Sequence, residues 1–252
     1  MVDLPPRRAA LFVAWGNAFL AGDVDPDTAS AAIRGRDESH EVMGLSQDRV
    51  TLPVALQVLA REGARGFRLV LPVAGDVSGL PGPPAFNAAA LEAGEAVLVT
   101  SARPLGAVPT LTGTPDAVRV SWTASPVAHR SDGPPSLTEA ERELAGAMRE
   151  ATDLLTSLDI ARLGPESADL LAALRGGAFD GPRLPPGLPP RADEVAVRGR
   201  RLAAIVTLAR ADDGGALSAG EATRRREALA PLDRAARRAI CAAFSAGAHQ
   251  EH

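Results

Sequence analysis

The hydrophobic pattern of the chain changes character at residues 131–135, a short run of Ser, Asp, Gly and Pro. Before this run, short apolar stretches switch between helical spacing and the two-residue spacing of strands. After it, apolar residues keep helical spacing and no stretch alternates as a strand does. The change predicts an α+β or α/β amino-terminal part with a small sheet and helices, followed by an all-helical carboxy-terminal part.

The same change predicts the domain organisation. We expect an α/β-like domain over residues 1–130 and a helical domain or helical extension over residues 131–252. Residues 180–190 are rich in proline, which sustains neither a helix nor a strand, so they are expected to form a connector. Strands are expected only before residue 131.

Local signals place the elements of the amino-terminal part. Asp25 can cap a helix that begins at Pro26 and ends at Gly35. The other elements expected from spacing and turn residues are helices at residues 52–61 and 85–93 and strands at residues 67–71, 96–100 and 118–123.

The first apolar run, residues 9–21, follows two arginines and so imitates an export signal. Gly16 and Asn17 interrupt the run, and a set of large apolar side chains shares one helical face. This set is Leu11, Trp15 and Phe19. We therefore expect an amphipathic helix packed on the domain. No stretch approaches the ~20 apolar residues that cross a bilayer, so no membrane partner is expected.

Helical spacing dominates the carboxy-terminal part. Ser136 and Glu139 form a capping-box pattern, which predicts a long helix from this point. A shorter helix is expected at residues 165–175, and two or three more complete the chain, with apolar faces that include Leu202 and Ile240.

Composition excludes several classes of function. All 27 basic residues are arginine, so there is no lysine to complete a phosphate-binding loop, a kinase ATP site or a pyridoxal Schiff base. Cys241 is the single cysteine, so the chain can form neither an internal disulfide nor a multi-cysteine metal site. A reducing cytoplasm is the natural compartment for such a chain.

The most suggestive candidate site is the Gly/Pro loop at residues 72–87, which leads from an expected strand into an expected helix. Ligands often lie beyond strand ends, where glycines let backbone amides approach an anion. Prolines remove such donors, however, and the loop fits neither a dinucleotide nor a phosphate-binding motif. We favour an ordered structural loop packed by Leu80 and Phe86. The polar residues that a ligand would contact are Asp76, Ser78 and Asn87.

No residue pattern points to catalysis or to a bound metal. The four histidines fit no metal-ligand spacing, and Ser78 lacks the GxSxG spacing of a hydrolase nucleophile. Cys241 lies in an apolar helical stripe, as a buried inert thiol does. Glutamates such as Glu139 are explained by the favourable dipole at a helix start. We therefore assign no catalytic residue, no metal and no cofactor.

Arginines decorate the last helices, and within residues 191–252 they exceed the acidic residues by three. Arginine contacts to phosphate drive nonspecific nucleic-acid binding. Acidic residues are interleaved, and aromatic residues that could stack on bases make up only 3% of the chain, which favours a solvated face of paired charges. The residues that a nucleic acid would contact are Arg224, Arg225, Arg226, Arg237 and Arg238.

The run at residues 79–97, GLPGPPAFNAAALEAGEAV, resembles a stretch of an uncharacterised protein family of high-GC actinobacteria. The resemblance implies a bacterial cytoplasmic setting and brings no activity, ligand or catalytic residue with it. We expect a non-catalytic binding or scaffolding protein whose partner is a protein or a small molecule. The first alternative is a small-molecule enzyme or sensor that uses the loop at residues 72–87. The second is weak nucleic-acid binding through the carboxy-terminal arginines.

Overall fold

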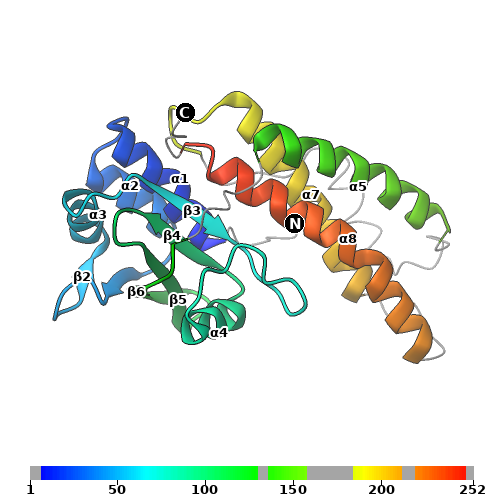
Figure 1. Cartoon of the computed structure of the whole chain (residues 1–252), viewed down its shortest axis with the longest axis horizontal. Coiled ribbons are helices and arrows are strands. Elements are labelled where there is room, and N and C mark those ends of the chain that lie inside the picture. The colour runs from blue at the N-terminus through cyan, green and yellow to red at the C-terminus, as the bar shows by residue number, and fades with distance from the viewer. Residues whose placement is uncertain (1–6, 130–135, 158–183, 212–218, 248–252) are drawn as a thin grey trace. The chain divides into compact units, whose positions relative to one another are not determined.

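The computed structural model describes residues 7–129, 136–157, 184–211 and 219–247 (Figure 1). These residues divide into two compact units. One unit contains the sheet and the first four helices, together with short segments that include Gly187 and Ser245, and the other contains the long helices that follow residue 136. The chain is a mixed α+β protein with a helical carboxy-terminal part, which confirms the predicted fold class.

The first unit is built on a six-stranded mixed sheet with the strand order β2-β1-β6-β5-β4-β3. The strands are β1 (Ser39–Met43), β2 (Val50–Thr51), β3 (Gly66–Val70), β4 (Ala96–Thr100), β5 (Leu105–Thr114) and β6 (Ala117–Pro126). Strands β1 and β6 are parallel, and the other neighbours are antiparallel. The sequence predicts β3, β4 and β6, whereas β1, β2 and β5 were not expected.

One face of the sheet packs against α1 (Arg8–Ala21). The ring of Phe12 lies edge-on to Phe67 of β3 and to Trp122 of β6, with centroid distances of 5.5 and 5.1 Å. Every residue from Ala9 to Ala18 is buried, so α1 is not the amphipathic helix that the spacing suggests. The reason is that the sheet, α2 (Pro26–Arg34) and α3 (Leu52–Arg61) all pack on it.

Gly16 and Asn17, which interrupt the first apolar run, make this packing possible. A Cβ atom at Gly16 would lie 2.8 Å from Cδ2 of Phe67, so the glycine permits the close approach of α1 to β3. The Asn17 side chain accepts the Phe67 N–H at 2.7 Å and donates to the Phe67 carbonyl oxygen at 2.9 Å. Two residues further along the same strand, the Leu69 N–H donates to the Ser245 hydroxyl oxygen at 3.1 Å. These side chains satisfy the backbone of an edge strand that would otherwise be open for pairing.

The helices α2 and α3 follow the local signals closely. The Asp25 carboxylate accepts the N–H groups of Asp27 and Thr28 at 3.0 and 2.9 Å, and Pro26 is the first helical residue. Satisfying free amides at a helix start is how an aspartate cap stabilises a helix. The bounds of α3 coincide with the expected helix at residues 52–61.

The opposite face of the sheet packs against α4 (Pro84–Ala93). Val70, Leu98 and Val108 from three neighbouring strands form a core with Phe86 of α4 and with Leu80 of the preceding loop. Gly106 of β5 lies under the Phe86 ring, where any side chain would collide with it. Figure 1 shows α4 on the other side of the sheet from α1. The loop at residues 72–87 is therefore anchored to the core by Leu80 and Phe86.

The second unit is helical. It contains α5 (Leu137–Ser157), most of α7 (Pro190–Ala211) and α8 (Ala219–Phe244). The described residues after 129 contain helices and no strand, as the hydrophobic pattern predicts. The helix expected at residues 165–175 lies outside the described residues. Of the connector expected at residues 180–190, the described residues 184–189 form neither a helix nor a strand.

Ion pairs join the three helices of this unit pairwise. Arg198 of α7 lies 3.5 Å from Glu141 of α5, and Arg238 of α8 lies 2.8 Å from Glu143 of α5. Arg210 of α7 lies 3.6 Å from Asp233 of α8. Each exposed pair contributes at most about 1 kcal/mol to stability, so the buried apolar faces hold the helices together and the ion pairs fix which faces meet.

Candidate functional site

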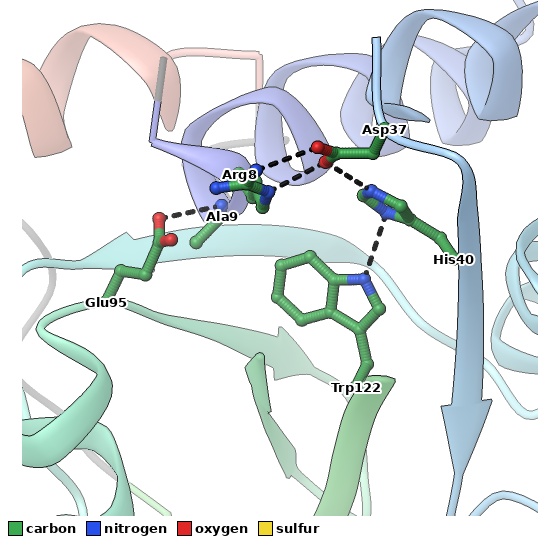
Figure 2. A network of polar contacts seen from close by, with 6 residues as sticks. All are labelled: Arg8, Ala9, Asp37, His40, Glu95 and Trp122. Carbon is green, nitrogen blue, oxygen red and sulfur yellow. Dashed lines mark hydrogen bonds and ion pairs between the residues drawn. The ribbon is translucent and has the colours of Figure 1, made fainter. Parts of the chain in front are cut away.

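Four polar side chains from four separate segments form a continuous chain under α1 (Figure 2). Arg8 stands at the start of α1, Asp37 in the link between α2 and β1, His40 on β1 and Trp122 on β6. The Arg8 Nε–H and one of its terminal N–H groups donate to the two oxygens of Asp37, each at 2.7 Å. This two-pronged geometry is the strongest form of an arginine–carboxylate contact.

The His40 imidazole links the carboxylate to the indole. His40 Nε2 lies 2.9 Å from Asp37 Oδ2, and Trp122 Nε1 lies 3.2 Å from His40 Nδ1. An indole N–H can only donate, so His40 Nδ1 must be unprotonated and accept, and Nε2 must carry the proton that is donated to Asp37. The contacts therefore assign a neutral imidazole with its proton on Nε2.

The electrostatics of the three ionisable groups agree with this assignment. Burial lowers the pKa of the His40 imidazole, and the hydrogen bond with Asp37 offsets this effect only in part. Burial tends to raise the pKa of Asp37, but the hydrogen bonds from Arg8 and His40 outweigh it and hold that pKa below its usual value. The hydrogen bonds to Asp37 raise the pKa of Arg8. At neutral pH the hydrogen-bonded network therefore contains the Arg8–Asp37 ion pair and a neutral His40 imidazole next to Trp122.

A second carboxylate holds the same end of α1. Glu95, directly before β4, accepts the backbone N–H of Ala9 at 2.9 Å through Oε2. Arg7 occupies the N-cap position and its side chain makes no cap hydrogen bond, so a residue distant in sequence performs the capping. Burial raises the pKa of Glu95, and the hydrogen bond from Ala9 works against that rise. Arg8, Asp37 and Glu95 together fix where α1 begins on the sheet.

The chemistry open to this network is limited by its own contacts. An Asp–His pair serves as a catalytic base where the second ring nitrogen faces a hydroxyl or thiol nucleophile. Here that nitrogen accepts from an indole, which offers no nucleophile, and the His40 side chain has no exposed surface. The network therefore joins α1, β1 and β6 as a structural unit.

The structure brings Asp76 and Ser78 of the Gly/Pro loop together and places Asn87 on α4. The Asp76 carboxylate accepts the Ser78 N–H at 3.2 Å, and Ser78 is exposed. Asn87, on α4, accepts the Gly82 N–H at 2.9 Å. Asp76 and Asn87 thus each close a turn of the loop to which they belong, and their binding of a ligand stays a prediction.

The structure describes two of the five arginines considered for nucleic-acid binding. Arg237 donates to Asp233 at 3.1 Å, and Arg238 is paired with Glu143. The other three candidates lie on α8, and their side chains are outside the described residues; these are Arg224, Arg225 and Arg226. Nucleic-acid binding by this helix stays a prediction.

The described residues contain neither a metal-ligand cluster nor a helix that could span a membrane. No cluster of three or more His, Cys, Asp or Glu side chains that could hold a metal ion occurs among them. None of their helices combines the length and the apolar character that crossing a membrane requires.

Sequence reasoning missed the polar network. The sequence patterns available for histidine are metal-ligand spacings, and His40 fits none of them. The network residues are spread from position 8 to position 122, so only the fold brings them together. The one local signal is the three-residue separation of Asp37 and His40.

The sheet and the helices make this a mixed α+β protein with a helical carboxy-terminal part. Two family models match it, one in the amino-terminal part and one in the carboxy-terminal part. Residues 9–141 match the family described as Rv1486c-like protein, N-terminal domain, and residues 138–241 match Rv1486c-like protein, C-terminal domain. The chain belongs to the Rv1486c-like family, which confirms the resemblance of residues 79–97 to an actinobacterial family.

Two relatives come from Mycobacterium tuberculosis. The chain is 27% identical to the "Uncharacterized protein Rv1486c" over 282 aligned positions, which cover 93% of this chain and 95% of the relative. It has the same identity and coverage with the "Uncharacterized protein MT1533" of a second strain. No solved structure matches the chain.

Proposed function

We propose that the protein is a non-catalytic binding or scaffolding protein of the bacterial cytoplasm. The observation that carries the proposal is that the His40 ring is enclosed by protein groups. Both ring nitrogens are engaged by protein groups, with Asp37 on one side and Trp122 on the other, and the side chain is fully buried. A general base must reach the proton that it removes, and this ring reaches only its two protein partners.

The polar groups of the Gly/Pro loop support the same proposal over the enzyme or sensor alternative. Asp76 and Asn87 direct their side-chain oxygens to backbone amides of the loop itself. Leu80 and Phe86 fix the loop to the core. These contacts support an ordered structural loop over a loop whose polar groups converge on a substrate.

The ion pairs of the helical unit support a protein or small-molecule partner over a nucleic acid. Arg198, Arg210 and Arg238 each pair with a carboxylate of a neighbouring helix. A phosphate backbone would have to displace these carboxylates to gain the same arginines. The cytoplasmic location is supported by the single cysteine, Cys241, which can form no internal disulfide.

The test is a search for ligands followed by a test for turnover. The full chain is screened by thermal shift against a library of small metabolites, because a ligand that binds the native state raises its melting temperature. Each ligand found is then incubated in large molar excess over the protein and quantified by mass spectrometry. We expect stoichiometric binding and complete recovery of the ligand. Conversion of many equivalents of any ligand would overturn the proposal.

Single substitutions test whether a ligand binds at the loop or elsewhere on the protein. If the loop at residues 72–87 is the recognition surface, the variants Asp76→Asn and Asn87→Asp should alter ligand affinity. His40→Gln, which keeps a polar group in the buried network, should leave that affinity unchanged. Turnover of a ligand by the native chain that is lost in Asp76→Asn or Asn87→Asp would instead support the enzyme alternative, which uses this loop.

A further inference from the structure

A cavity of about 340 Å³ lies in the sheet unit, where the end of α3 meets the turn between β4 and β5. Its floor is apolar and consists of Leu59, Val99 and Leu105, of which the first two are buried. Small-ligand sites in proteins occupy roughly 300–1,000 Å³. The cavity is therefore of a size to take a small metabolite.

Two opposite charges stand at the rim of this cavity. Glu62 and Arg103 both line it, and both are exposed. The two side chains form no ion pair with each other, and neither is hydrogen-bonded to another side chain in the described part of the chain. Glu62 and Arg103, neither of which has a side-chain partner among the described residues, thus line the same cavity from separate positions in the sequence.

Each of the two charged residues belongs to a hydrogen-bonded stretch of backbone. Glu62 is the C-cap residue of α3, with its N–H donating to the Val58 carbonyl at 2.9 Å. Arg103 belongs to the turn after β4, which is closed by a hydrogen bond of 2.7 Å from the Ser101 hydroxyl to the Arg103 carbonyl oxygen. The negative end of the α3 dipole adds to the charge of Glu62 and favours a cation there. Arg103 offers the planar donor pair that suits a carboxylate.

We propose that this cavity binds a small zwitterion with an aliphatic body, of the class of the free aliphatic α-amino acids. The ligand carboxylate pairs with Arg103, its ammonium group with Glu62, and its side chain covers Val99 and Leu105. The inference rests on the proposed binding function and gives that function a site and a ligand class. No bond of the ligand is made or broken.

The test uses L-leucine and the full chain labelled with nitrogen-15. Titration is followed by the backbone amide resonances, and we expect shifts confined to residues 59–64 and 99–105, with a rise in melting temperature. Two analogues, 4-methylpentanoate and isopentylamine, each lack one of the two charges. Each should bind about tenfold more weakly or worse, because a hydrogen bond to a charged group typically accounts for a factor of this order.

Matched variants assign the effect to the rim charges. Arg103→Gln and Glu62→Gln should each weaken leucine binding about tenfold or more while the melting temperature of the free chain is unchanged. Arg61→Gln removes an exposed charge that does not line the cavity, and it should bind leucine as the native chain does.

Three results would overturn the proposal. These are the absence of shifts up to about 10 mM leucine, which is beyond the range of weak specific sites; shifts that map elsewhere; and equal binding by Arg103→Gln and Arg61→Gln. Failure of the proposed function is distinguishable from these outcomes. Consumption of a bound ligand would refute the non-catalytic function, whereas leucine that is recovered unchanged but shifts resonances at another surface would refute the cavity site alone.

Discussion

Replacing Trp122 by Phe removes the indole N–H that donates to His40 and keeps an aromatic ring against Phe12. Both Trp122 and the His40 side chain are fully buried, so water cannot replace the lost donor without opening the core. The substitution therefore leaves His40 Nδ1 as a buried acceptor without a partner. We expect a clear loss of stability with the fold retained.

The magnitude has two parts. An unsatisfied buried acceptor costs about 1–3 kcal/mol. The smaller ring also gives up apolar burial and leaves space in a packed core, which adds about 1–2 kcal/mol. The free energy of unfolding should fall by about 2–5 kcal/mol in all, which is a large share of the roughly 5–15 kcal/mol available to a folded domain.

The assay is urea unfolding at neutral pH, followed by circular dichroism, for a double-mutant cycle of Trp122→Phe and His40→Leu. The His40→Leu variant removes the acceptor, so Trp122→Phe should cost less in that background. We expect a coupling free energy of about 1–3 kcal/mol, the portion that belongs to the hydrogen bond. A coupling below about 0.5 kcal/mol would refute the bond between these two residues as the source of the effect.

Three further predictions concern the same unit. Stability should fall as the pH drops below 6.5, because unfolded His40 gains a proton there while the buried ring, whose pKa is lowered, does not. Glu95, whose pKa is raised, acts in the opposite direction, and the stability from Asp37, whose pKa is lowered with the help of His40, is lost only at lower pH, so the native chain is compared with His40→Gln in mildly acidic solution, where the histidine titrates. Asn17→Leu should cost about 2–4 kcal/mol in urea unfolding and speed hydrogen exchange of the Phe67 amide, since both backbone groups of Phe67 lose their partner. Gly16→Ala should lower the melting temperature and cost about 1–3 kcal/mol by overpacking the Phe67 ring, and a variant as stable as the native chain would contradict the close approach.

Elements with complete local signals were predictable from the sequence. The cap at Asp25 and the proline at position 26 define α2, and the continuous apolar run of β4 needs a buried position in any fold. The long helix α5 begins at the predicted capping box, where Ser136 and Glu139 are hydrogen-bonded to each other. Such signals act within a few residues, so a single sequence contains them.

Elements whose signal depends on a neighbour were not predictable. Strand β5 contains Pro109, which argues against a strand in an inner position. The register shows why it is tolerated: β4 pairs with β5 only from Leu105 to Ala107, so Pro109 removes no bond to β4. Strand β1 has polar residues at alternate positions, including Glu41, and its buried positions include His40, which a hydrophobic pattern cannot identify as core.

The candidate site illustrates the same limit more sharply. The loop at residues 72–87 could be singled out because its glycines and prolines are adjacent in sequence. The network of Arg8, Asp37, His40 and Trp122 requires β1 to lie beside β6 and the start of α1 to lie within reach of Asp37, and no spacing rule encodes that arrangement. A single sequence shows which polar side chains are present, and the fold determines which of them form hydrogen bonds with one another.

The central claim is that His40 is a neutral, closed member of a structural network, with its proton on Nε2. The direct measurement is the nitrogen-15 spectrum of the His40 ring in the full chain at neutral pH, with His40→Gln used to assign the signals. We predict one protonated nitrogen, Nε2, coupled to its carbon-bound protons in the pattern of the neutral Nε2–H tautomer, and one unprotonated nitrogen, Nδ1. A proton on Nδ1, alone or together with one on Nε2, would contradict the account, because Trp122 could then no longer donate to that atom.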